Sequence, residues 1–397
     1  MNIANRVEDL SKTKDLRAQL MTPTFHLPTV SVVVVNYNYG RYLAESVESV
    51  FAQTYANVEC IIVDNASTDE SPTVIAELQQ RYPGIVVVWR TANDGQTAAS
   101  LDGFARATGQ YVIFLDADDV LLPRALETHI YVHLSSRLHV GFTAGDMLQA
   151  RNGDIVVATG EAMNTYIRSG RGIRTNIWRP YRAEPGWPPA HMGEDLSRKA
   201  RYVPPLCTHW IWAPTSGLCY RRDALALFAD NPNLPRLWTA TDMYFALGLG
   251  GWCGSILIDE PVFIYRLHGS NIFSQMAQLH HTLNYQPGGS GDYNDKALAL
   301  IVDQLTSHSE RFSQNLLLKL HLVIMLFGLS GPEADPELPQ WARRSSAAYR
   351  LVMHAEHFAQ NVGPRLTYLL MTIFGVPLNV IWDCRKKIAR ARKRDRH

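Results

Sequence analysis

The six residues Ser-Val-Val-Val-Val-Asn at 31–36 decide the fold class of this chain. Four consecutive valines without polar alternation are typical of a strand that is covered on both faces, as in a parallel sheet. A second apolar run, Cys-Ile-Ile-Val, follows at 60–63, and the apolar spacing over 42–54 between the two runs predicts a helix. Strand, helix and strand at this spacing indicate a right-handed βαβ unit.

The same alternation continues downstream. Its predicted elements are a helix over 72–82, a strand over 85–89, a helix over 96–107 and a strand over 111–115. We therefore expect an α/β fold with a doubly wound, mostly parallel sheet flanked by helices. Ligands of such sheets bind beyond the carboxyl ends of the strands, so the loops after the four strands should surround one pocket. These loops are rich in Asn, Asp and Gly and cover residues 36–40, 64–69, 91–95 and 116–119.

The remaining segments differ from this region in composition. Residues 1–28 form a polar extension, and the weaker periodicity of 136–272 predicts long loops that pack against the same sheet. From 273 to 397 we expect a C-terminal helical appendage, with helices at 316–328 and 341–358.

Charge and cysteine content exclude several classes of protein. The formal net charge is +1 at pH 7 and the basic excess lies after Asp383, so the body offers no surface typical of nucleic-acid binding. The five cysteines are widely spaced without a CxxC pair, which argues against a zinc site or a disulfide framework. Residues 1–20 lack the apolar segment of a secretory signal. We expect a cytoplasmic protein.

An apolar stretch at 366–382 precedes the basic tail. It is interrupted by Gly375 and Pro377 and is shorter than the roughly 20 apolar residues that span a bilayer. An interfacial helix with a basic flank, docked on an anionic membrane, fits this pattern. That interpretation places the protein peripherally on the inner face of the cytoplasmic membrane. The alternative is a buried C-terminal helix with a solvated, charged end.

Three carboxylates, Asp116, Asp118 and Asp119, follow the predicted strand at 111–115. Acids held this close together repel one another, and a cation that neutralises them would lower the cost. A divalent ion bound through one or two carboxylates and completed by substrate phosphates is the usual solution. A solvated acidic turn is the alternative interpretation.

A second polar segment, Asp64-Asn65-Ala66-Ser67-Thr68-Asp69, follows the strand at 60–63. Its side chains can hydrogen-bond a base and a ribose, although Ser67 or Asp69 could equally cap the next helix. Its predicted place on the same sheet edge as the three acids favours the binding interpretation.

Three segments, in this order and spacing, resemble the nucleotide-binding half of family 2 glycosyltransferases, which have the GT-A fold. They are SVVVVNYNYGRYLAESVESVFAQTY (31–55), VECIIVDNASTDES (58–71) and GQYVIFLDADDVLLP (109–123). A looser similarity continues through SGLCYRRDAL (216–225), TATDMYFALGLGG (239–251) and YRLHGSN (265–271). The resemblance implies that 29–135 is the donor-binding half of a GT-A domain and that 136–272 is its acceptor-binding and catalytic half.

The resemblance also implies a donor, a nucleotide diphosphate-sugar, and residues that bind it. These residues are Asn36, Tyr37, Asp64, Asn65, Asp94, Gly95, Asp116 and Arg266. By the resemblance, Asn36 and Tyr37 border the nucleobase and Asp116 reaches the ribose side. Asn65 stands where the family often has Asp, which leaves the choice of base, UDP or dTDP, open.

Two further residues match the family's metal site. By the resemblance, Asp118 and His268 hold Mg²⁺ or Mn²⁺ across the diphosphate. A divalent ion there would stabilise the negative charge that builds on the leaving group. A loop histidine with an ordinary hydrogen bond is the alternative for His268.

Asp242, at the start of the segment 242–248, matches the family's catalytic base. A carboxylate that takes the proton of an attacking hydroxyl accelerates such a reaction roughly 10²- to 10⁴-fold. One base without a second nucleophile implies a single displacement that inverts the anomeric centre. An acid that merely complements a helix dipole is the alternative.

These expectations combine into an inverting, metal-dependent sugar transfer to a hydroxyl of a saccharide or lipid-linked acceptor, in surface polysaccharide synthesis. Four tryptophans are candidates for an acceptor wall or for simple packing: Trp187, Trp210, Trp212 and Trp238. A non-catalytic binder of carbohydrates or nucleotide-sugars is the main alternative. A nucleotidyltransferase lacks support because NYNYGRY (36–42) is not a Gly-rich triphosphate loop, and a dehydrogenase lacks its GxGxxG. The absence of a QxxRW segment disfavours a processive polymerase.

Overall fold

The structure of this chain is a computed structural model. It describes residues 26–174, 177–181, 187, 192–205, 207, 210–271, 291–308, 311–312, 339–344 and 346–394. The predicted helix at 316–328 and nearly all of the predicted extension at 1–28 lie outside these residues.

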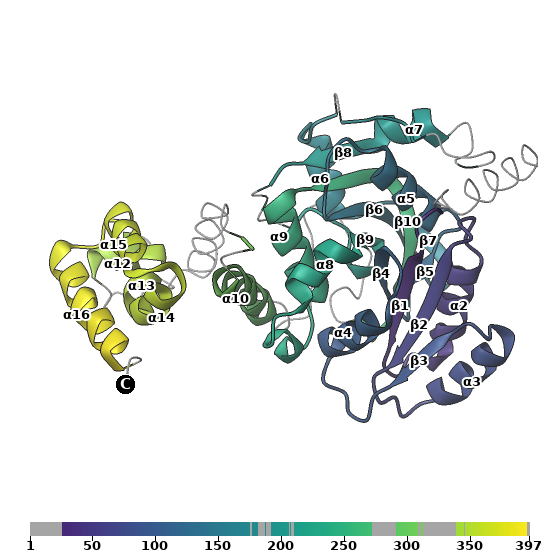
Figure 1. Ribbon diagram of the computed structural model, residues 1–397, viewed down its shortest axis with the longest axis horizontal. Helices are drawn as coiled ribbons and strands as arrows, with labels where there is room; N and C mark the ends of the chain where they lie inside the picture. Colours follow the sequence, from purple (N-terminus) through teal and green to yellow (C-terminus); the bar gives the residue numbers. More distant parts are fainter. Residues whose placement is uncertain are drawn as a thin grey trace, which may run out of the picture.

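The first half of the sheet alternates strands and helices as predicted. Its elements are β1 (Val30–Asn36), α2 (Gly40–Phe51), β2 (Val58–Asp64), α3 (Ser71–Arg81), β3 (Val86–Trp89), α4 (Gln96–Arg106) and β4 (Tyr111–Asp116). These four strands are parallel and lie in the order β3-β2-β1-β4. Figure 1 shows α2 and α3 on one face of this half and α4 on the other, so both faces are covered.

Burial explains why the valines at the start of β1 form a strand. Val30, Val32, Val33 and Val34 are completely buried in the core, which rewards an apolar side chain on both faces of the sheet. The helix α4 packs closely on this strand through Gly103. A Cβ atom added there would lie 2.2 Å from Val33 Cγ1, so only glycine allows this approach.

The second half of the sheet corrects the expectation of long loops over 136–272. Its strands are β5 (Val120–Leu121), β6 (Phe142–Arg151), β7 (Asp154–Val157), β8 (Ala200–Val203), β9 (Leu218–Arg221) and β10 (Ser255–Leu267). Its helices are α5 (Ala125–Ser135), α6 (Glu161–Arg168), α7 (Met192–Lys199), η1 (Thr215–Gly217), α8 (Arg222–Ala229), η2 (Leu234–Arg236) and α9 (Thr241–Cys253).

The strand β9 joins the two halves into one mixed sheet. It pairs antiparallel with β4 on one side and with β6 on the other, and the full order is β3-β2-β1-β4-β9-β6-β10-β5. These strands were not predicted from the sequence, for two reasons. Nearly every residue of β6 is buried, so it shows no polar alternation, and the pairing of β10 with β6 is irregular around Pro261.

The C-terminal part is helical, as predicted. The described helices are α10 (Gly291–Ser307), α12 (Gln340–Arg344), α13 (Ser346–Met353), α14 (Ala355–Val362), α15 (Pro364–Ile373) and α16 (Leu378–Arg394). Figure 1 shows α12 to α16 gathered at one end of the molecule, beyond α10.

The expectation of one interfacial helix over 366–382 is wrong. The chain breaks between α15 and α16, where Gly375 adopts a left-handed conformation (φ +75°) and Pro377 follows. Glycine ends the first helix and proline cannot continue it, so the two helices turn against each other. Among the described residues no helix combines the length and the apolar character that crossing a bilayer requires.

Candidate active site

A cavity of about 540 Å³ opens at the carboxyl ends of the parallel strands. Each of the four predicted loops contributes to its lining, with Tyr37, Asn65, Asn93 and Asp116 as examples. The expectation that these loops surround one pocket is therefore confirmed. The second half of the fold also contributes to the lining, which includes Asp242 of α9.

The loop after β1 and the loop after β2 are tied together by hydrogen bonds. The Asn36 side-chain amide donates to Asp64 Oδ1 (2.9 Å) and to Ser67 Oγ (3.1 Å). The Ser67 backbone N–H donates to Asp64 Oδ2 (3.0 Å), so both oxygens of this carboxylate are occupied. Asn36 and Asp64 are buried behind the cavity wall, whereas Tyr37 lines the cavity. Asn36 and Asp64 can therefore position the wall, but they do not line the space a donor would fill.

Asn65 lines the cavity and is held by a residue that the sequence analysis missed. Its side-chain amide donates to Asn93 Oδ1 (2.8 Å), and its oxygen accepts from Arg90 Nη1 (2.7 Å). Arg90 also forms ion pairs with Asp94 (3.0 Å) and Asp102 (2.9 Å). Asp94 is thus paired with Arg90, and it is not among the residues that line the cavity. The position of Arg90 directly after β3, at the same edge of the sheet as Asn65, could have indicated this role from the sequence.

Gly95 lines the cavity and brings the two halves of the sheet together. Its φ of +93° is a conformation that glycine adopts without cost, and an added Cβ would lie 2.3 Å from the Trp238 carbonyl oxygen. The next residue, Gln96, donates its backbone N–H to the same oxygen (2.8 Å). The Gln96 side chain donates to Asp116 Oδ1 (2.7 Å) and accepts from the Thr239 hydroxyl (3.1 Å). The sequence analysis did not predict this role for Gln96.

The acids after β4 lie in an environment that opposes their ionisation. Burial, followed by the charge of Asp118, raises the pKa of Asp116 to about 8. Burial also raises the pKa of Asp119 well above its usual range, with further contributions from Asp118 and Asp116. Asp119 accepts hydrogen bonds from the Ser216 hydroxyl (2.7 Å) and the Arg266 backbone N–H (3.2 Å). If all three acids were ionised, they would therefore carry more negative charge than their own donors offset, and a bound cation would favour the ionised form.

The end of β10 closes onto this acid loop. His268 Nε2 lies 2.9 Å from Asp118 Oδ2, and Arg266 Nε donates to the Asp118 carbonyl oxygen (2.9 Å). Arg266 also forms an ion pair with Glu45 (2.8 Å), and the His268 ring stacks on Tyr42 with 5.0 Å between the ring centroids. The structure thus brings together Asp118, Arg266 and His268, three residues that the resemblance places at the diphosphate.

Asp118 and His268 have the donor types that suit a divalent ion. Within the described part of the chain no group of three His, Cys, Asp or Glu residues forms a protein-only metal site. Two protein ligands, with water and phosphate oxygens at the other positions, are typical of Mg²⁺. The Ser270 backbone N–H donates to His268 Nδ1 (3.2 Å), so the ring proton lies on Nε2. Ligation through Nε2 requires this proton to leave and the Ser270 bond to rearrange.

Asp242 lies in the first turn of α9 and lines the cavity. It accepts the Met243 backbone N–H (2.7 Å). Burial raises its pKa, and hydrogen bonds from Met243 and Thr215 offset part of this effect. Ala240, just before the helix, has a left-handed conformation (φ +69°), which turns the chain so that the helix begins at the cavity. A carboxylate with a raised pKa in a cavity is suited to accept a proton.

The four candidate tryptophans separate into two pairs. Trp210 and Trp238 line the cavity. Trp212 is buried and donates its ring N–H to the Ser255 hydroxyl (2.9 Å), and Trp187 packs edge-on against Tyr55 and Tyr131. Only the first pair can contact an acceptor in this arrangement.

A parallel half-sheet that ends in a cavity, with an Asp-X-Asp loop at its edge and a mixed second half, is the architecture of the GT-A glycosyltransferases. Comparisons agree with this class. The crystal structure of S. aureus TarS residues 1–349 in complex with UDP-GlcNAc superposes with a TM-score of 0.52 at 16% identity, covering 92% of each chain.

Sequence comparisons give the family. Residues 31–138 match the model of the glycosyl transferase family 2. An uncharacterised glycosyltransferase of Nostoc sp. is 32% identical over 244 residues, which cover 61% of this chain and 66% of the relative. The minor teichoic acid biosynthesis protein GgaB of Bacillus subtilis is 37% identical over 93 residues, 23% of this chain and 10% of that protein. This chain belongs to glycosyltransferase family 2.

Proposed function

We propose that this chain transfers a sugar from a UDP- or dTDP-sugar to a hydroxyl of a saccharide or lipid-linked acceptor, with inversion at the anomeric carbon. The observation that carries the proposal is that Asp118, in the loop after β4, and Asp242, in the first turn of α9, line the same cavity. In this proposal residues 29–135 bind the donor and residues 136–272 supply the base and the acceptor wall. The UDP-GlcNAc in the TarS structure supports a nucleotide-sugar as donor.

The proposed reaction is a single displacement. The acceptor oxygen forms a bond to the anomeric carbon as the bond from that carbon to the diphosphate oxygen breaks, and the acceptor proton passes to Asp242. The raised pKa of Asp242 strengthens it as a base, because a proton that binds more tightly is more easily taken from a hydroxyl. Tyr37 and Asn65 line the donor side of the cavity, with Asn36 and Asp64 fixing their loops from behind.

A divalent ion, when bound, would stabilise the charge that develops on the leaving diphosphate. Asp118 and His268 are the residues that would hold it. Arg266 adds a fixed positive charge at the same loop, because its guanidinium is anchored to the Asp118 carbonyl and to Glu45.

Donor binding tests this proposal. Titration calorimetry with a panel of UDP- and dTDP-sugars should show binding in the presence of Mg²⁺ or Mn²⁺ that is lost with a chelator. Asp118→Ala should weaken this binding at least tenfold, whereas Glu77→Ala, which removes an exposed carboxylate on α3, should not. Binding without turnover of any acceptor would favour a non-catalytic relative, and the absence of any donor binding would contradict the proposal.

We further propose a role in surface polysaccharide synthesis, with peripheral docking on an anionic membrane. The teichoic acid relative supports the first point. For the second, four apolar side chains are more than half exposed next to the basic tail: Leu369, Ile373, Leu378 and Trp382. The Arg385 guanidinium lies 5.4 Å from the Trp382 ring centroid, so charge and apolar surface are adjacent.

Liposome co-sedimentation tests the docking. The double variant Leu378→Asp, Trp382→Asp should lose binding to anionic vesicles, because both side chains are exposed and their replacement leaves the core intact. Ile155→Asp, at a similarly exposed apolar residue on β7, is the matched control. Equal sedimentation of the double variant and the control would contradict membrane docking through α16.

A further inference from the structure

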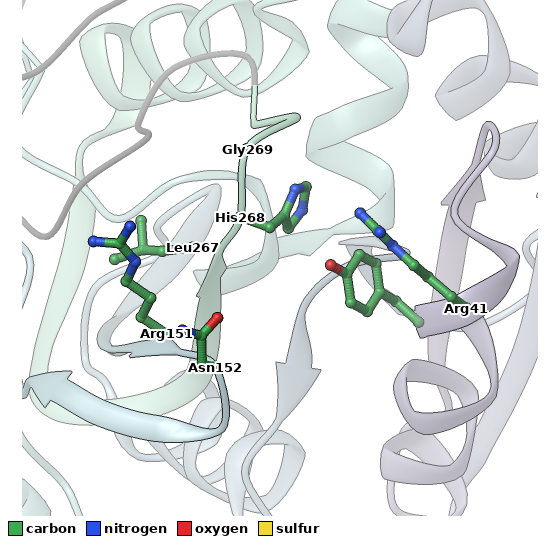
Figure 2. Close-up of a pocket in the computed structure, with 7 residues that line it drawn as sticks. Arg41, Arg151, Asn152, Leu267, His268 and Gly269 are labelled. Atoms are coloured by element: carbon green, nitrogen blue, oxygen red, sulfur yellow. The ribbon is translucent and has the colours of Figure 1, made fainter.

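A second hollow, of about 430 Å³, lies beside the donor cavity. Three segments that are distant in sequence line it: Arg41 and Tyr42 at the start of α2, Arg151 and Asn152 at the end of β6, and residues 267–269 at the end of β10. Figure 2 shows Arg41 and Arg151 on opposite sides of this hollow, with His268 between them.

The hollow has an uncompensated positive charge. Its lining includes two arginines and one histidine but no carboxylate. Arg90 and Arg266 at the donor cavity form ion pairs, whereas the described residues offer no ion pair to Arg41 or to Arg151. Arg41 and Arg151 are exposed on opposite sides of the hollow, and no carboxylate of its lining offsets their charge, so an anion in the hollow would be attracted from both sides.

The surroundings keep this hollow separate from the donor cavity. His268 lines the hollow and is hydrogen-bonded to Asp118, which lines the donor cavity, so this pair forms the wall between the two spaces. Tyr42 supports the wall from the side of the hollow. It stacks on His268, and the guanidinium carbons of Arg41 and Arg266 lie 4.5 and 4.7 Å from its ring centroid.

We propose that the hollow binds a phosphate group carried by the acceptor substrate. This inference rests on the proposed function, because it assigns the substrate that receives the sugar to the class of phosphorylated or phosphate-linked saccharides and lipids. The guanidinium group presents a planar fork of donors that matches phosphate oxygens, and charge-assisted hydrogen bonds of this kind are the strongest that a partly exposed site forms. The His268–Asp118 pair would separate the phosphate of the acceptor from the diphosphate of the donor.

Glycerol phosphate, titrated into the protein saturated with UDP and Mg²⁺, tests the proposal. We expect binding to the wild-type protein, an approximately tenfold loss in Arg41→Gln and in Arg151→Gln, and no measurable binding in the double variant. UDP affinity should stay unchanged in all three. Arg106→Gln removes an exposed arginine on α4, outside both spaces, and should bind glycerol phosphate as the wild type does.

Two results would overturn the proposal. If the arginine variants weaken UDP binding, the hollow serves the donor's diphosphate. If glycerol phosphate binds equally well to the double variant, it binds elsewhere. A protein that binds glycerol phosphate in the expected pattern but no nucleotide would instead refute the proposed function and leave the phosphate site standing. Displacement of glycerol phosphate by neutral vesicles that carry a polyprenyl phosphate would assign the phosphate to a lipid, and lack of displacement would assign it to a soluble saccharide.

Discussion

Two polar loops at the same edge of the sheet differ in how their acids are compensated. In the loop after β2, Asp64 is buried and each of its oxygens accepts a hydrogen bond, from Asn36 and from the Ser67 N–H. In the loop after β4, Asp116 accepts hydrogen bonds from Gln96 and Thr215, but its burial and the charge of Asp118 outweigh them and its pKa rises to about 8. In the first loop, the carboxylate therefore has its hydrogen-bond donors within the folded chain. In the second loop, burial and the mutual charge of the acids oppose their ionisation.

This difference separates residues that shape a site from residues that act in it. A carboxylate with a full set of donors stabilises its loop, and its replacement should be felt as lost stability. A carboxylate held against its neighbours' charge lowers stability, and such groups concentrate where function requires them. The contrast yields three predictions.

The largest effect is expected at Asp242, a cavity residue outside both loops whose pKa is likewise raised by burial. Asp242→Asn keeps the size of the side chain and an acceptor for the Met243 N–H but cannot take a proton. We expect kcat to fall roughly 10²- to 10⁴-fold while the donor Kd stays within about threefold. Steady-state transfer assays and donor titration would check this. Retained kcat would remove Asp242 from the role of base.

The pH dependence of the transfer rate is a second test of Asp242 as the base. Because burial raises the pKa of Asp242, the base becomes protonated at a pH above the range of an ordinary aspartate, about 3.9. We expect kcat to decline as the pH is lowered, about tenfold per pH unit below an inflection that lies above the pKa of an ordinary aspartate. An inflection at or below the ordinary pKa of aspartate would contradict a base of this kind.

Stability should change in opposite directions when one acid of each loop is neutralised. The folded pKa of Asp116 is raised, so the wild-type protein loses stability as the pH rises from about 4 to about 8, and Asp116→Asn avoids this loss. We expect this variant to be more stable by on the order of 2 kcal/mol at pH 8, with a smaller gain at pH 5. Asp64→Asn places an amide donor against the Asn36 amide or the Ser67 N–H and should cost about 2 kcal/mol.

Denaturant unfolding with a chelator and without nucleotide would measure both changes. Asp154→Asn, at an exposed residue on β7, should stay within about 0.5 kcal/mol of the wild type. If Asp116→Asn and Asp64→Asn shift the free energy of unfolding in the same direction, the distinction between the two loops fails.

The first half of the sheet was predictable from the sequence because each of its strands and helices has a recognisable local pattern of apolar residues. The valines after Ser31 and the run at 60–63 are buried on both faces, and the loops that follow them must meet at one edge. The second half escaped prediction. The strand β9 is a short antiparallel insertion between β4 and β6, and the residues that position it are distant in sequence.

The sequence predicted the kind of site and several of its lining residues, but not the contacts that hold these residues in place. Asp116, Asp118, Asp242 and Asn65 do line the cavity. The burial of Asp64 and the pairing of Asp94 with Arg90 depend on contacts between loops, which no local pattern encodes. The hydrogen bond between His268 and Asp118 is of the same kind, because it depends on β10 ending beside the acid loop. Only the family resemblance indicated that these two residues act together.

The strand β9 has one mechanical consequence. Since it is hydrogen-bonded to both β4 and β6, the donor-facing and acceptor-facing walls belong to a single continuous sheet with no hinge between them. Enzymes made of two lobes admit substrates by swinging the lobes apart, but here such a swing would break a ladder of backbone hydrogen bonds. In the proposed reaction we therefore expect entry of the donor and release of the nucleotide to require movements of the loops at the cavity rather than separation of the two halves of the sheet.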